Sequence, residues 1–223
     1  MNRSLFAVLA VLALPAAAQD KPPERVRGEV AALNGNDLDL RTRDNQTVHL
    51  KLAPQVGVAA AEKADASAIQ DGTFIGTAAV AEPDGTLRAL EVHVFPESMR
   101  GTGEGHRPWD LGPASSMTNG AVAAMRPGKP ASGAAKGTGS SMTNATVAAN
   151  KAKGGARTLT LKYAGGEQTV VVPPDVPIVR LAPGDRSLLV PGAHVFAIAN
   201  RQDDGSLLVQ RLTVGKGGLV PPM

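Results

Sequence analysis

Cysteine is absent from the 223 residues, and aromatic side chains make up only 3% of them. Without thiols the chain has no disulfide, no thiolate metal site and no cysteine nucleophile. One Trp, one Tyr and four Phe leave few rings for stacking on bases or for lining an aromatic cofactor pocket. The core must therefore be aliphatic, and we expect stability to come from β-sheet packing.

Long apolar runs are absent beyond the N-terminus. Arg3 precedes an unbroken apolar run at 5–14 and the small residues 16–18, which is the order of a secretory signal peptide. We expect residues 1–18 to be removed and the mature protein to be soluble, periplasmic and to begin at Gln19. No later run approaches the length of a spanning helix, so we expect no membrane span.

The charge is nearly balanced, with 23 Lys and Arg against 20 Asp and Glu. Proteins that bind nucleic acid normally concentrate basic residues on one face, so we expect no nucleic-acid partner. The 25 Gly and 17 Pro, together with 43% hydrophobic residues, are typical of a folded and turn-rich chain.

Apolar residues alternate with period two from Arg25 onward, which predicts short β-strands. In the first half we expect strands at 25–32, 37–41, 47–52, 73–81 and 86–95. The alanine-rich stretch 59–70 predicts a short helix. Five strands with one helix between the third and the fourth are typical of a small Greek-key barrel of the OB kind.

The same order recurs in the second half. There we expect strands at 143–149, 157–163, 168–172, 176–181, 193–200 and 206–214. Residues 72–95 align without a gap on 192–215, and the matches fall at turn glycines and alternating apolar positions. The alternative is that the two closing hairpins resemble each other by chance.

These patterns predict an all-β protein made of two tandem OB-like Greek-key barrels. The first barrel is expected at 19–96 and the second at 143–215, with a C-terminal tail at 216–223. A Gly/Pro/Ser-rich connector at 97–142 joins them. On this interpretation the fragments 19–124 and 140–223 should each retain β-structure.

The connector contains a repeated word that a flexible spacer has no reason to keep. SSMTNGAVAA at 115–124 matches SSMTNATVAA at 140–149 in eight of ten positions. We expect each copy to begin a strand, and the stretch 125–139 between them to be the true linker.

Catalytic signatures are missing from the chain. There is no GxSxG elbow, HExxH, P-loop or paired-carboxylate motif. We therefore expect no catalytic residue, no nucleotide cofactor and no enzymatic activity. His49 and His93 alternate with apolar neighbours in strand patterns, which predicts that both face solvent.

Unusual residues gather in one segment, 99–117. Its candidate side chains are Met99, Glu104, His106, Trp109, Asp110 and Met117. Thioether and imidazole are the soft ligands left to a chain without cysteine, and they suit Cu(I) or Ag(I) better than Zn(II). Met99, His106 and Met117 are thus the candidate metal ligands. The alternative is that Trp109 and the methionines pack the seam between two barrels.

Two resemblances follow from these residues. The combination of Met, His and Trp resembles the sites of small periplasmic copper chaperones, although those carry their ligands on barrel strands. The order GEVAALNGNDLDL, DGTFIGTAAVAEPDGTLRALEVHVFP, MRGTGEGHRPWD, SSMTN and VPPDVPIVRLAPGDRSLLVPGAHVF resembles exported bacterial proteins with tandem OB-like domains of unknown function. The second resemblance implies a fold and an exported location, and it names no reaction.

Two hypotheses on function remain open from the sequence. The first is a non-enzymatic periplasmic binding or interaction protein, whose partner is an envelope protein or a small ligand. The second is a soft-metal binding protein or metallochaperone for Cu(I) or Ag(I).

Overall fold

A computed structural model describes residues 22–127 and 155–222, and this part of the chain is all-β. The strands are β1 (Glu24–Asn34), β2 (Asp37–Arg41), β3 (Thr47–Ala64), β4 (Phe74–Ala81), β5 (Leu87–Val94), β6 (Gly105–Pro108), β7 (Ser115–Pro127), β8 (Arg157–Tyr163), β9 (Gly166–Val172), β10 (Ile178–Gly184), β11 (His194–Arg201) and β12 (Leu207–Gly215). Single 3-10 turns stand at η1 (Ala66–Ala68), η2 (Glu97–Met99), η3 (Arg186–Leu188) and η4 (Lys216–Gly218).

Five strands close into a barrel. The order of pairing around it is β1, β2, β3, β12, β11 and back to β1, with β3 and β12 parallel and the other pairs antiparallel. Its interior is aliphatic, as the scarcity of aromatics predicts. Fully buried members of this core include Leu38, Leu40 and Val209.

Five of the remaining strands make a second ring, in the order β7, β8, β9, β5, β4 and back to β7. The parallel pairing of β5 with β9 is short and joins Leu87 to Val170 and Arg88 to Val171. A separate aliphatic core fills this ring, with Leu159, Leu161 and Ile75 among its fully buried members.

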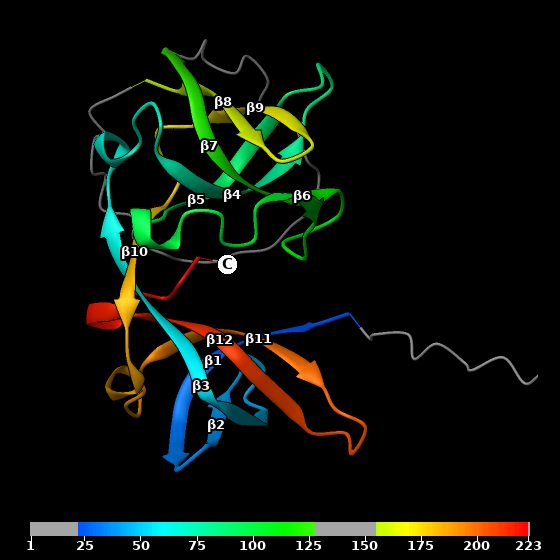
Figure 1. Ribbon diagram of the computed structural model, residues 1–223, viewed down its shortest axis with the longest axis vertical. Coiled ribbons are helices and arrows are strands. Elements are labelled where there is room, and N and C mark those ends of the chain that lie inside the picture. The colour runs from blue at the N-terminus through cyan, green and yellow to red at the C-terminus, as the bar shows by residue number, and fades with distance from the viewer. Residues whose placement is uncertain (1–21, 128–154, 223) are drawn as a thin grey trace, which may run out of the picture.

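Each ring takes its closing hairpin from the other half of the sequence. Hairpin β4–β5 pairs with β7 and β9, whereas hairpin β11–β12 pairs with β1 and β3. Strands β3 and β10 run from one ring to the other and pair with each other on the way (Figure 1). The predicted segments 19–96 and 143–215 therefore each contribute strands to both rings, and neither contains all the strands of one ring.

The predicted helix at 59–70 is wrong, and the residues of this stretch explain why each ring takes its closing hairpin from the other half of the sequence. β3 stays extended to Ala64, and only a single 3-10 turn follows. Ala60 pairs with Ala182 of β10 on one side and with Val214 of β12 on the other. Pairing on both sides outweighs the helix propensity of alanine. An unbroken strand then carries the chain out of one ring and into the other.

The described part of the predicted connector at 97–142 contains two strands. β6 and β7 lie within it, and β7 is a full member of the second ring. The first copy of the repeated word, 115–124, does begin a strand, as predicted. The signal peptide, the second copy at 140–149 and most of the linker at 125–139 lie outside the described residues.

Local turns recur at equivalent positions of the two halves. The carboxylate of Asp65 accepts from Ser67 N at 2.7 Å, and that of Asp185 accepts from Ser187 N at 2.8 Å. In the closing hairpins Gly85 and Gly205 have φ of 82° and 83°, a region that favours glycine. The aligned sequences at 72–95 and 192–215 therefore carry the same backbone features.

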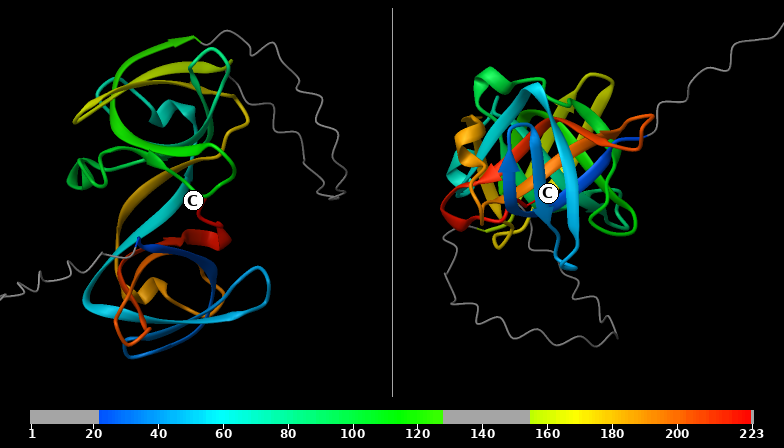
Figure 2. Two further views of the ribbon diagram at one scale, coloured as in Figure 1. Left: turned by 90° about the vertical axis from the view of Figure 1, so that its right-hand side faces the viewer. Right: turned by 90° about the horizontal axis from the view of Figure 1, so that it is seen from below.

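The C-terminal segment returns between the two rings (Figure 2). Gly215 makes this return feasible, because a Cβ there would stand 1.7 Å from the carbonyl oxygen of Leu219. Pro221 is buried, and the carbonyl of Pro222 bonds to Nε2 of His93. The part of the tail at 216–222 thus packs against the protein.

Because each ring takes its closing hairpin from the other half of the sequence, cleaving the chain between the halves tests this arrangement. We expect a protein with a specific protease site inserted within 128–154 to remain one species in size-exclusion chromatography after cleavage. Separated pieces 19–127 and 155–223 should each lack a cooperative urea transition, because each ring needs strands from both, and mixing should restore it. Cooperative unfolding of either piece alone would show that the rings are self-contained.

Candidate functional site

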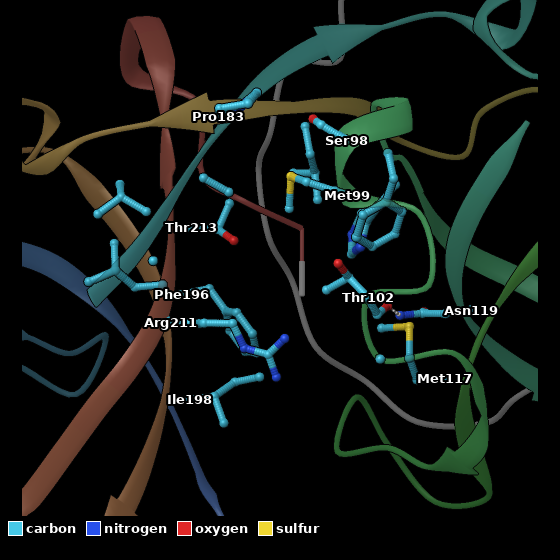
Figure 3. Close-up of a pocket in the computed structure, with 18 of the residues that line it drawn as sticks. Ser98, Met99, Thr102, Met117, Asn119, Pro183, Phe196, Ile198, Arg211 and Thr213 are labelled. Atoms are coloured by element: carbon cyan, nitrogen blue, oxygen red, sulfur yellow. Dashed lines mark hydrogen bonds between the residues drawn. The ribbon is translucent and has the colours of Figure 1, made fainter. Parts of the chain in front are cut away.

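A cavity of about 460 Å³ lies between the two rings. One wall comes from β11 and β12, where Phe196, Ile198 and Thr213 point away from their own barrel core. Figure 3 shows these side chains facing Met99 and Met117 across the cavity. The cavity is of the size that proteins use for small-molecule ligands, and most of its lining is apolar.

Three of the candidate residues from the sequence meet at this cavity: Met99, Trp109 and Met117. Met117 lies on β7 with its side chain 3% exposed, and Met99 ends η2 directly after β5. Both methionines therefore lie at the seam between the rings. This placement is the packing role that the sequence offered as an alternative to metal binding.

The other candidate residues do not line the cavity. His106 pairs with Thr118 across β6 and β7, its Nδ1 lies 2.8 Å from Thr118 Oγ1, and its ring stacks on Tyr163. Glu104 accepts a hydrogen bond from the backbone of Ala164 at 2.7 Å. The predicted ligand set of Met99, His106 and Met117 is thus not brought together.

Strand alternation explains this division. Neighbouring residues of a strand point to opposite faces, so Arg107 shares the cavity face with its pairing partner Met117 while His106 faces away. Asn119 lies on the same face as Met117. Its side chain packs closely over Gly76, where an added Cβ would stand 2.6 Å from Asn119 Oδ1.

Most of the lining was not predicted from the sequence, and its unpredicted members include His93, Arg107, Phe196 and Arg211. The prediction that His93 faces solvent is wrong, because the residue is only 2% exposed. β5 pairs with β10, and the C-terminal segment covers the imidazole, so a position that looks like the outer face of a hairpin is buried. The prediction for His49 is confirmed, since its side chain is 79% exposed.

Arginines and aromatic rings stack at one side of the cavity. The Trp109 and Phe196 rings lie 6.2 Å apart. Arg25 stands 4.0 Å from the centroid of Trp109, and Arg107 stands 5.8 Å from it. Cation–π contacts of this kind use the faces of the rings and leave the N–H edges of the guanidinium groups available to a ligand.

Positive charge exceeds negative charge in this cluster. Asp110 binds Arg27 through both carboxylate oxygens at 2.8 Å, and this hydrogen bonding lowers the pKa of Asp110. Burial lowers the pKa of the Arg107 guanidinium, and the nearby charges of Arg25 and Arg211 lower it further. The site thus holds like charges close together around a half-buried arginine.

Two buried polar atoms of the lining residues have no hydrogen-bond partner within the described part of the chain, namely Trp109 Nε1 and Asn119 Oδ1. Buried polar atoms without partners are uncommon and costly. A bound molecule with an acceptor atom would satisfy Trp109 Nε1, whereas Asn119 Oδ1 is packed against Gly76. Among the described residues no group of three or more His, Asp or Glu side chains could hold a metal ion.

Comparisons with protein-family models, with curated proteins and with solved structures found no match to this chain. Within residues 22–127 and 155–222, no helix is long and apolar enough to cross a membrane.

Truncating Met99 and Met117 to alanine should lower the free energy of unfolding by different amounts, because the two side chains are buried to different extents. We expect Met117→Ala to destabilise the protein by about 2 kcal/mol, the lower end for a buried methionine because one side already faces a cavity. Met99→Ala, which is half-buried, should cost about 1 kcal/mol. The control Val190→Ala lies at a residue 54% exposed and should stay within about 0.5 kcal/mol. Urea unfolding measures all three, and equal losses for both methionines would contradict the assigned burial.

Proposed function

We propose that this chain is a non-enzymatic, exported periplasmic protein that binds a small ligand in the cavity between its two rings. The observation that carries the proposal is the cavity of about 460 Å³ with apolar walls and the buried Trp109 Nε1, which has no hydrogen-bond partner among residues 22–127 and 155–222. Apolar walls with a few polar groups are typical of ligand sites. The signal-peptide pattern at 1–18 supports the exported location.

We further propose that the two rings are OB-like domains. In the first ring the strands follow one another as first, second, third, fifth and fourth, which is the order of a five-stranded Greek-key barrel. The second ring repeats that order with its closing hairpin taken from the first half. The resemblance to exported bacterial proteins with tandem OB-like domains supports the same assignment.

A binding role suits the polar groups that reach the cavity. His93 is the imidazole of the lining, and its Nε2 is bonded to the carbonyl of Pro222. A carbonyl only accepts hydrogen bonds, so Nε2 is the donor there and is already engaged within the protein. The arginines of the lining bind and orient anions better than they transfer protons.

Binding in the cavity is tested with the uncharged fluorescent probe N-phenyl-1-naphthylamine. We expect saturable binding that quenches the emission of Trp109, since the only tryptophan of the chain lines the cavity. Ile198→Trp fills the cavity from β11 and should weaken binding by at least about tenfold, whereas the control Val190→Trp lies on an exposed residue and should not. Equal binding by the two variants, with unchanged urea midpoints, would contradict the proposal.

One observation favours the alternative of a soft-metal protein: Met99 and Met117 line the same cavity. The alternative requires that Met99→Ala and His106→Ala each weaken Cu(I) binding, because losing one ligand leaves the ion undercoordinated. We expect no Cu(I) to be retained against a strong chelating competitor, since His106 is turned toward Thr118 and Tyr163. Retention by the native protein and loss in both variants would establish the metal function instead.

A further inference from the structure

Arginines of both rings reach the proposed ligand cavity. Arg107 comes from β6, beside the second ring, and Arg211 comes from β12 of the first. Figure 3 shows the Arg211 guanidinium extending into the space between Phe196 and Met117. The two positive charges therefore line one cavity although they are far apart in the sequence.

Neither arginine has an acidic partner among the described residues. Arg107 donates only to the carbonyl of Gly103, at 2.6 Å, and Arg211 makes no ion pair there. The nearest carboxylate of the cluster, Asp110, is occupied by Arg27. A half-buried guanidinium without a counter-charge is unfavourable, and a bound anion would relieve that cost.

Trp109 adds a neutral donor to the same lining. Its Nε1 can only donate, and it is buried without an acceptor in the described part of the chain. Two guanidinium groups and one indole N–H thus offer donors that match acceptor oxygens. The rest of the lining is mostly apolar, with Phe196, Ile198 and Met117 among its members.

From this arrangement we infer that the ligand is a small apolar anion, with an aliphatic or aromatic body between the rings and a carboxylate or similar group on Arg107 and Arg211. This inference rests on the proposed binding function of the cavity. A neutral apolar molecule would leave the arginines uncompensated, and a cation would add repulsion. A charged group on an apolar body satisfies both parts of the lining.

The test compares three probes with the same ten-carbon chain: decanoate, decanol and decyltrimethylammonium. We expect decanoate to displace N-phenyl-1-naphthylamine at a concentration at least about tenfold lower than either of the others, which corresponds to one charge-assisted contact. Its advantage over decanol should shrink as salt is raised, because part of it is electrostatic. Equal displacement by decanoate and decanol would overturn the inference.

Variants of the arginines test where the anionic group of the ligand binds. Arg211→Gln, at an exposed residue, and Arg107→Gln should each reduce the preference for decanoate over decanol about tenfold. Arg180→Gln removes the same charge from an exposed position of β10 outside the lining and is the matched control. A loss in the control equal to that in Arg211→Gln would overturn the inference, because the effect would then be one of net charge.

Two further outcomes distinguish a failure of this inference from a failure of the proposed binding function. If the neutral probe binds and Ile198→Trp blocks it while decanoate shows no preference, the binding function stands and the anionic ligand is wrong. If neither the probe nor decanoate binds, the binding function itself fails. Co-sedimentation with phosphatidylglycerol vesicles that Arg211→Gln abolishes would also overturn the inference, in favour of a lipid surface.

Discussion

The extended pairing of β3 along β10 and β12 is the constraint on which the rest of the structure depends. Ala60 has a strand on each side, so the chain cannot turn into a helix there and continues to Ala64. At about 3.3 Å per residue the strand is long enough to leave one ring and reach the other. The hairpin β4–β5, which follows β3, then closes the ring that β3 has reached. In the second half of the chain β10 runs to the other ring, and the hairpin β11–β12 that follows it closes that ring.

The exchange also explains why a cavity lies at the centre of the molecule. Each ring keeps its own aliphatic core, so the rings are joined by strands and a small cluster around Val179 and Leu181. Outward-facing residues of β7 and β11 then meet without interdigitating fully, and Met99 and the C-terminal segment fill only part of the space. The seam is therefore a place where side chains from both halves face one space.

The sequence predicts the strands and turns well because these depend on local patterns. The Asp-Gly turns of the closing hairpins and the period-two alternation lie where the sequence predicts them, whereas the Asp65–Ser67 turn falls inside the stretch 59–70 that the sequence predicts as a helix. The pairing partner of each hairpin could not be predicted, because the two hairpins share their turn glycines and apolar alternation, and neither pattern specifies which ring a hairpin joins. Arg211 carries no local signal at all: it is an exposed residue of β12, and only the arrangement of the two rings places it in the same lining as Met117.

The site segment shows the same limit at a smaller scale. Trp109 and the methionines are conspicuous as rare residues, but their neighbours in the sequence are divided by strand alternation, which sends Arg107 to the cavity and His106 to Thr118. Because the lining comes from both rings, the ligand that we propose would contact both halves of the chain at once. Such a ligand would stabilise the folded state by an amount set by its concentration and affinity, and its contacts would oppose separation of the exchanged hairpins.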